Sequence, residues 1–299
     1  MSVASSIVDR THRGRLALTG GDAAAFLDGQ LSNDISALAP GTGCRAALLT
    51  PKGKMLADVR VLRTPDGDEF WLETERVALQ ALFDALRRGV IGWDAELHKR
   101  TLEQTTLSLV GEPSELAVHA SAHDVIGGAP LLRVGTPEGE DVICMTTDAG
   151  AVRTALGVPE LDEHEADVLR VEAGVPRYGA ELDDSVIPQE AALNDTHVSF
   201  TKGCYVGQET VARLHWRGKP NRHLRGLRLS EPVAPGTPLV LGEREVGRVA
   251  SSVVSPRLGP IALALVRREA GPGDELSAGD ATAVVSELPF DGAATSNAT

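Results

Sequence analysis

The sequence predicts an α+β protein in which a mixed region of short helices and strands is followed by a region of strands alone. Up to Arg225, amphipathic helical segments alternate with β-branched, strand-like segments. After Arg225 the segments are strand-like and are separated by Gly and Pro turns, which is typical of a small β-barrel or sandwich. With 299 residues, 42% of them hydrophobic, the chain is long enough for two or three cores.

Four helices are predicted in the mixed region, because apolar residues recur at helical spacing after an aspartate that can cap the helix, before a glycine that can end it, or between the two. They cover residues 22–31, 76–89, 148–157 and 162–174. The second is the clearest, since Leu79, Leu82 and Leu86 share one face with Phe83 before two arginines and Gly89.

Strands are predicted from β-branched and alternating patterns. In the mixed region they cover residues 57–63, 105–110, 131–134 and 141–145. In the C-terminal region the strand-like segments are 224–230, 237–254, 259–269 and 281–290. We expect the polar stretch DGAATSNAT, residues 291–299, to be a disordered tail.

Composition argues against several classes of protein. The formal net charge of −13, from 42 acidic and 29 basic residues, argues against a general nucleic-acid binder. The longest uninterrupted apolar run, Ile261–Val266, is far shorter than the roughly 20 residues of a membrane-spanning helix. Three widely separated cysteines without a CxxC pair indicate a reducing compartment. We therefore expect a cytoplasmic protein that makes no membrane contact.

Other motifs are too incomplete to predict a site. His119 and His123 are four residues apart, but no glutamate completes an HExxH motif, so no metal site is predicted. The segment PKGK, residues 51–54, lacks the spacing of a phosphate-binding loop.

A local basic run interrupts the acidic chain. Residues 213–228, RLHWRGKPNRHLRGLR, contain six arginine or lysine residues and no acid. Such runs are commonly solvated surface. Alternatively, the run forms a docking surface for a ligand that carries carboxylates or phosphates, with Trp216 as a stacking platform. The sequence leaves both interpretations open.

The loop FTKGCYVGQET, residues 200–210, combines a thiol and an amine between glycines. Cys204 follows Lys202 by two residues and precedes a predicted helix start; a nearby cation and a helix N-terminus both favour a reactive thiolate. Cys204 and Lys202 are therefore the candidate catalytic residues. The alternatives are that Cys204 is a small buried side chain, and that Gln208 and Glu209 merely begin a helix.

The segment KGCYVGQE, Lys202–Glu209, resembles the signature of the YgfZ family, which are folate-binding iron–sulfur cluster maintenance proteins related to the glycine-cleavage T-protein, an aminomethyltransferase. Further segments resemble the family in the same order. They are FLDGQLSNDI (26–35), AALLTPKGKMLADVRV (46–61), RVEAGVPRYGAELDDSVIPQEAAL (170–193), ETVARLHWRGKPNRHLRGL (209–227) and VGRVASSVVSPRLGPIALALVRRE (246–269). The resemblance covers nearly the whole chain apart from residues 103–160 and the tail.

The resemblance implies an α+β, three-lobed T-protein-like fold. Two interleaved mixed α/β lobes, within residues 1–225, would surround a central folate cavity, and residues 226–290 would form a C-terminal β-barrel. The implied cofactor is tetrahydrofolate or a derivative, with a transient contact between an iron–sulfur cluster and Cys204 as a further expectation.

Folate-binding residues follow only from the resemblance. They are Asn33, Asp34, Asp58, Arg170, Glu172, Gln208, Glu209 and Arg213. A carboxylate such as Glu172 suits the donor edge of a pterin, and arginine suits the carboxylates of a folate tail. The alternative for Arg170 and Glu172 is an ion pair or packing on the helix surface.

The chain departs from the T-protein pattern at one point that bears on the reaction. T-proteins carry adjacent aspartates where this sequence has Ala57 and Asp58. Because transfer of a one-carbon unit needs an acid or base beside the reacting amine, losing one carboxylate favours folate binding without classical aminomethyl transfer. The expected function is an accessory factor for assembly or repair of iron–sulfur clusters.

The alternative function is a folate-dependent aminomethyltransferase or methyltransferase, in which Asp58 or Glu172 would support the chemistry. A third, weaker alternative is RNA binding through the basic run, which would depend strongly on salt. The expected partners are folate and iron–sulfur assembly proteins or client enzymes, and the simplest expectation for the oligomeric state is a monomer.

Overall fold

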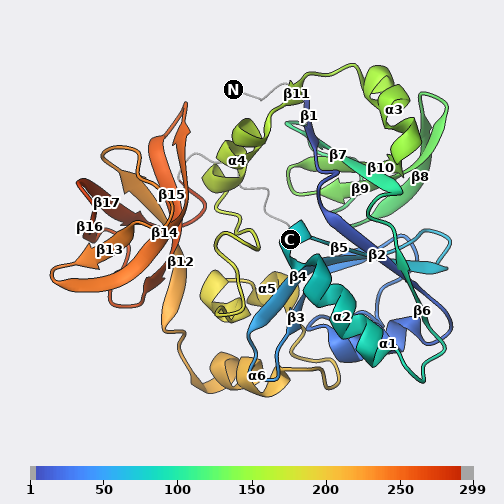
Figure 1. Cartoon of the computed structure of the whole chain (residues 1–299), viewed down its shortest axis with the longest axis horizontal. Coiled ribbons are helices and arrows are strands. Elements are labelled where there is room, and N and C mark those ends of the chain that lie inside the picture. Colours follow the sequence, from blue (N-terminus) through green and yellow to red (C-terminus); the bar gives the residue numbers. More distant parts are fainter. Residues whose placement is uncertain (1–4, 291–299) are drawn as a thin grey trace.

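The computed structural model describes residues 5–290, and it consists of two β-sheets with their helices and a closed β-barrel (Figure 1). The expected disordered tail, residues 291–299, lies outside the described residues. Among the described residues, no helix is both long and apolar enough to cross a lipid bilayer.

The first sheet is antiparallel, has five strands in the order β3-β4-β5-β2-β6, and is covered by helices α1 and α2 (Figure 1). Its elements are β2 (Gly14–Thr19), α1 (Ala23–Gln30), β3 (Gly43–Leu49), β4 (Met55–Arg63), β5 (Glu69–Thr74), a 3₁₀ turn (Arg76–Ala78), α2 (Leu79–Gly89) and β6 (Glu96–Lys99). The predicted second helix and the strand predicted at residues 57–63 are confirmed.

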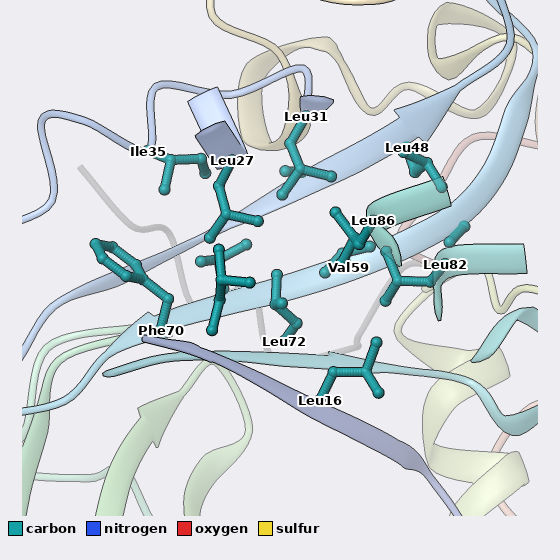
Figure 2. Packing of buried hydrophobic residues seen from close by; sticks show 14 of the residues in the cluster. Leu16, Leu27, Leu31, Ile35, Leu48, Val59, Phe70, Leu72, Leu82 and Leu86 are labelled. Atoms are coloured by element: carbon teal, nitrogen blue, oxygen red, sulfur yellow. The ribbon is translucent and has the colours of Figure 1, made fainter. Parts of the chain in front are cut away.

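An apolar core fills the space between this sheet and its two helices (Figure 2). Leu27 of α1 and Leu82 and Leu86 of α2 pack against Val59 and Leu72 of the sheet, and all five side chains are fully buried. Alternate residues of β4 point to this core, so the residues between them face the opposite side. That opposite side carries the candidate site.

The second sheet has six strands in the order β11-β1-β7-β10-β9-β8 and carries α3. Its elements are β1 (Ser6–Asp9), β7 (Gln104–Val110), β8 (Ser121–Ile126), β9 (Ala129–Thr136), β10 (Gly139–Met145), a 3₁₀ turn (Thr146–Asp148), α3 (Ala149–Leu156) and β11 (Glu160–Leu161). Because β1 joins this sheet whereas β2 to β6 form the other, the two lobes are interleaved in sequence, as expected.

A buried ion network joins the two sheets. Arg60 on β4 pairs with Glu73 on β5 and, at 2.6 Å, with Asp141 on β10, and Arg15 on β2 lies 2.8 Å from the same Glu73. Although burial opposes ionisation of Glu73, Arg60 and Arg15 hold its pKa well below the usual range. Such a network ties the lobes together only while every member keeps its partners.

Residues between the second sheet and the barrel form three short helices and a 3₁₀ turn. They are α4 (Glu163–Glu172), the 3₁₀ turn (Pro188–Ala191), α5 (Asn194–His197) and α6 (Gln208–Arg217). Helix α4 begins with a capping box, in which Asp162 accepts from the backbone of Glu165 and the Glu165 side chain accepts from that of Asp162. It lies between the barrel and the second sheet (Figure 1).

The C-terminal region is an antiparallel barrel closed in the order β12-β15-β14-β13-β16-β17. Its strands are β12 (Arg222–Leu229), β13 (Pro238–Leu241), β14 (Arg244–Ser255), β15 (Gly259–Arg267), β16 (Glu275–Ala278) and β17 (Ala281–Ser286). The barrel and the two sheets with their helices confirm the predicted α+β, T-protein-like architecture.

Two residues expected to cap helices, Asp22 before α1 and Asp148 before α3, make no side-chain capping bond. Instead, Asp22 accepts a hydrogen bond of 3.0 Å from the backbone N–H of Asp94, and the Asp94 side chain accepts in return from Gly21 at 3.3 Å. The Asp22 side chain therefore fastens the segment that precedes β6 to the start of α1.

Candidate functional site

A polar cluster lies on the face of β3 and β4 that points away from the apolar core. It consists of Asn33, Arg45, Asp58, His119 and His197, and we name it the central polar cluster. Arg45 and Asp58 lie at neighbouring positions of the two strands, because Asp58 is opposite Ala47 and Arg60 is opposite Arg45. Helix α5 brings His197 onto the same strands.

Asp58 is the negative group of the cluster. Its Oδ1 lies 3.0 Å from Nε2 of His197 and 3.6 Å from a guanidinium nitrogen of Arg45. Burial would raise the pKa of Asp58, but Arg45 and then His197 outweigh it and lower that pKa to about 2. Its second oxygen, Oδ2, makes no hydrogen bond to a described residue, so the carboxylate can accept from a ligand.

Hydrogen bonds on both ring nitrogens orient His197. An ionised Asp58 can only accept, so Nε2 of His197 donates to it. Nδ1 of His197 lies 2.7 Å from the hydroxyl of Thr196, which donates when the ring is neutral. The ring is thereby held in one tautomer beside a carboxylate, the arrangement that positions an imidazole for proton transfer.

His119 closes the cluster from the segment before β8. Burial, followed by the charges of Arg45 and Arg60, lowers the pKa of His119 to about 3, so the ring is neutral in water at pH 7. Its Nδ1 is buried and has no hydrogen-bond partner among the described residues. A buried polar atom without a partner marks a place where a ligand or a water can be bound.

Asn33 and Asp34 lie at the edge of the cluster. The side chain of Asn33 donates to the backbone carbonyl of Arg45 at 2.7 Å and accepts from the backbone N–H of Asp34 at 2.9 Å. Asp34 in turn accepts from the backbone of Ala37 at 3.0 Å. Asn33 is thus used to hold the segment after α1 against β3, whereas the half-buried Asp34 carboxylate retains accepting capacity.

Sequence reasoning missed Arg45 and His197 and gave His119 no binding role. Arg45 occupies an ordinary strand position, and the segment NDTHVS around His197 matches no motif. Only the folded structure brings these residues together, because Asp58 and His197 are 139 residues apart in sequence.

The missing carboxylate at Ala57 has less bearing on the reaction than the sequence suggested. Ala57 is fully buried in the apolar core with α1 and α2, because successive strand residues point to opposite faces. Any side chain at this position points into the apolar core and away from the central polar cluster. The absence of a carboxylate at Ala57 therefore does not bear on acid or base chemistry in the cluster.

Arg170 on α4 makes four contacts that fasten neighbouring segments. It donates to Asp167 at 2.8 Å, to the carbonyl of Val175 at 2.8 Å, to Glu181 at 3.1 Å and to the hydroxyl of Ser251 on β14 at 2.7 Å. These bonds occupy all three guanidinium nitrogens, so the packing interpretation of Arg170 fits the structure better than the expected contact with folate.

Glu172 makes the second clamp between α4 and the barrel. It accepts a short hydrogen bond from the hydroxyl of Ser255 and a bond of 2.9 Å from the guanidinium of Arg257. Both of its oxygens are therefore engaged by the barrel, which fits the packing interpretation of Glu172.

Lys202 does not direct its charge at Cys204 as the sequence suggested. Its ammonium donates to the carbonyls of Asp28, Leu31 and Asn33 at 2.5, 3.0 and 2.7 Å and pairs with the Asp28 carboxylate at 3.2 Å. These carbonyls lie at the C-terminal end of α1, where the helix dipole favours a cation. Lys202 therefore anchors the loop, and its catalytic role stays a prediction.

Cys204 is exposed, whereas Cys44 is half-buried and Cys144 is buried. It lies three residues before Gly207, the residue that precedes α6. Gly207 has φ of 86°, and a Cβ there would lie 2.5 Å from the carbonyl of Thr50, so only glycine fits this turn. The backbone conformation at Gly207 is therefore fixed at the end of the loop that exposes the Cys204 thiol.

The remaining expected folate ligands lie on α6. Gln208 and Glu209 occupy its first turn, and Glu209 and Arg213 are exposed. No hydrogen bond or ion pair joins these three side chains to the central polar cluster within residues 5–290. Their position therefore suits a surface role.

A cavity of about 520 Å³ lies elsewhere. It opens between residues 180–186 and strands β14 and β15, and its polar lining includes Glu181, Arg222 and Arg267. None of the folate ligands expected from the sequence lines it. The cavity and the central polar cluster are thus separate features.

Two β-sheets with interleaved strands and a closing six-stranded barrel define the T-protein class of fold. Residues 2–126 match the GCVT N-terminal domain, and residues 222–291 match the glycine cleavage T-protein C-terminal barrel domain. The chain belongs to the aminomethyltransferase T-protein superfamily.

Individual relatives are distant. An aminomethyltransferase of Streptomyces coelicolor is 28% identical over 91% of this chain and 81% of its own. An uncharacterized protein of Haemophilus influenzae is 27% identical over 73% of this chain and 71% of its own. The crystal structure of the glycine cleavage system aminomethyltransferase T from Bartonella henselae superposes with a TM-score of 0.83 at 23% identity, covering 96% of this chain and 86% of that one. This structural likeness establishes the fold.

Proposed function

We propose that this protein is a tetrahydrofolate-binding accessory factor for assembly or repair of iron–sulfur clusters, of the YgfZ type, and that Cys204 carries its partner chemistry. The observation that carries the proposal is the exposure of Cys204 on a loop anchored by Lys202. The other two cysteines are less accessible. The signature KGCYVGQE supports the YgfZ assignment within the superfamily.

The central polar cluster suits a folate. The free Oδ2 of Asp58 can accept from the amino and ring N–H groups of a pterin, and the buried Nδ1 of His119 needs a polar partner. The guanidinium of Arg45, about one-third exposed, suits a carboxylate of the folate tail. A bound tetrahydrofolate would supply a one-carbon carrier, and the residues of this chain would orient it.

Classical aminomethyl transfer is the alternative function. The aminomethyltransferases among the relatives favour it, as does the Asp58–His197 pair, which has the geometry of an acid–base pair. Against it, the low pKa of Asp58 makes this carboxylate a weak base. The alternative predicts that Asp58 matters more than Cys204, and our proposal predicts the reverse.

Folate binding is tested by calorimetric titration with tetrahydrofolate, its 5-formyl derivative and unreduced folate. We expect a reduced folate to bind and Asp58→Asn to weaken the Kd at least tenfold. The matched control is Glu245→Gln, an exposed carboxylate on β14. Folate binding is refuted if no folate binds the wild type at millimolar concentration. Equal weakening of folate binding by both variants would refute the assignment of the site to Asp58.

The accessory role is tested by expressing variants in cells that lack the protein and measuring an iron–sulfur enzyme. Cys204→Ser should abolish rescue while leaving folate affinity within twofold of the wild type, and Cys144→Ser is the control. A parallel assay supplies folate and an aminomethylated lipoyl carrier to the purified protein. Ammonia release on the order of 1 per second or faster would favour the transferase instead.

A further inference from the structure

Helix α6 carries an exposed surface that combines one aromatic side chain with positive charge. Arg213, Trp216 and Arg217 are spaced i, i+3 and i+4 and are all exposed, with Trp216 70% accessible. The exposed Lys219 follows one residue after the glycine that ends the helix. We name these four residues the α6 surface; the helix lies at the edge of the molecule in Figure 1.

The structure divides the basic run in two. Its second half belongs to the barrel, where Arg222 pairs with Glu190 at 2.9 Å, Arg225 pairs with Glu287 at 3.0 Å and Arg228 lies 5.5 Å from the ring centre of Phe290. By contrast, Arg213, Arg217 and Lys219 form no ion pair within the described part of the chain. Three cations in a chain of net charge −13 therefore remain for an external partner.

Ring contacts attach the cysteine loop to the α6 surface. Phe200, at the start of the loop, stacks on His215 with ring centres 3.7 Å apart and an interplanar angle of 17°. His215 meets the edge of Trp216 at 4.6 Å. A partner that covers Trp216 would thus rest on the helix to which the Cys204 loop is packed.

We propose that the α6 surface docks a protein whose facing surface carries clustered carboxylates around an apolar recess for Trp216. Tryptophan and arginine are the residues most enriched among side chains that dominate interface binding energy, and an exposed indole gains most from being covered. Positive charge isolated on an acidic chain selects an acidic partner and steers its approach.

A nucleic acid fits this surface less well. Three cations neutralise about three phosphates, which supplies little of the counterion-release energy that drives such binding, and the remaining acidic surface repels a polyanion. In a symmetric dimer the α6 surface would face its own copy, which places like charges together. An asymmetric contact between two copies would extend into open chains of molecules. An acidic protein of a different kind satisfies charge and apolar contact together.

This inference rests on the proposed function, because it assigns to the α6 surface the partner that Cys204 would serve. The experiment places a photo-crosslinking benzoylphenylalanine at Trp216 in living cells and, as the matched control, at Val254, an exposed apolar residue of β14. We expect a protein crosslink specific to position 216. The crosslinked protein is then purified and its Kd for the wild type is measured at 50 and 500 mM salt.

Binding by that protein should weaken at least tenfold in Trp216→Ala, in the pair Arg217→Glu and Lys219→Glu, and at the higher salt concentration. Charge reversal of the carboxylates on the partner should restore binding to the Arg217→Glu, Lys219→Glu variant. Val254→Ala should bind like the wild type.

The docking inference is overturned by equal crosslinking at both positions, by crosslinks to RNA or to a second copy, or by a Kd that neither variant changes. The rescue assay in cells that lack the protein distinguishes failure of the docking inference from failure of the proposed function. If Trp216→Ala rescues iron–sulfur enzymes fully and Cys204→Ser does not, only the docking inference fails. Full rescue by both variants refutes the proposed function as well.

Discussion

The ammonium of Lys202 lies 2.7 Å from the backbone carbonyl oxygen of Asn33. Asn33 is two residues beyond Leu31, the C-cap of α1. Together with the carbonyls of Asp28 and Leu31 the Asn33 carbonyl forms an oxygen cage around a side chain that is only 1% exposed. Burial lowers the pKa of Lys202, and Asp28 opposes that shift. The lysine of the signature thus stabilises the loop that presents the cysteine.

Removing this cation should leave an unfilled oxygen cage. We expect Lys202→Ala to lower the free energy of unfolding by about 3–5 kcal/mol, because the half-buried Asp28 carboxylate and three backbone carbonyls lose the buried cation that donates to them. The loss is measured by urea denaturation, with the exposed Lys219→Ala as the unchanged control. Ammonium chloride, but not tetramethylammonium chloride, should restore part of the stability of Lys202→Ala, since only the smaller cation fits the cage. Identical effects of both salts would contradict a specific cage.

The Asp58 carboxylate should make stability depend on pH in acid. Its folded pKa of about 2 is below the ordinary value of about 3.9, so its contribution is present above pH 4 and is lost as the pH falls towards 2. Wild type should therefore exceed Asp58→Asn by about 2 kcal/mol at pH 6, and the gap should close near pH 2. Chemical denaturation of both proteins between pH 2 and 6 measures it. A constant gap would show that ionisation of Asp58 does not stabilise the fold.

The contacts of Arg170 predict that it stabilises the junction between α4 and the barrel. Arg170→Ala should cost about 3–5 kcal/mol, because it leaves the fully buried Glu181 without its cation. Arg248→Ala, which breaks an exposed ion pair on β14, should cost less than about 1 kcal/mol. Both are measured by urea denaturation. Comparable losses in the two variants would mean that the Arg170 contacts are no stronger than surface pairs.

The three cysteines should differ in their rates of alkylation. Burial raises the pKa of Cys44 to about 12 and also raises that of Cys144, so neither forms much thiolate at pH 7. We expect exposed Cys204 to react at least tenfold faster with limiting iodoacetamide, as read by mass spectrometry of the labelled peptides. The Cys44 rate should also climb steadily with pH up to 10. Labelling of Cys44 or Cys144 ahead of Cys204 would count against a thiol role for the loop.

Sequence alone determined part of the local structure and the superfamily of this protein. Helix α2 and the barrel strands other than β16 followed from apolar periodicity and from turn residues, which act over a few neighbouring positions. The resemblance carried by KGCYVGQE predicted the T-protein-like fold, because a signature with fixed spacing needs no knowledge of distant contacts.

Only the tertiary structure decided what the polar side chains contact. Lys202 reaches carbonyls more than 160 residues away and not the neighbouring Cys204, and Arg170 bonds to Ser251 of the barrel. Likewise, His197 becomes the partner of Asp58 only because α5 packs on β3 and β4. The physical reason is that a charged side chain takes the nearest partner once it is buried, and burial brings together residues that the sequence keeps far apart.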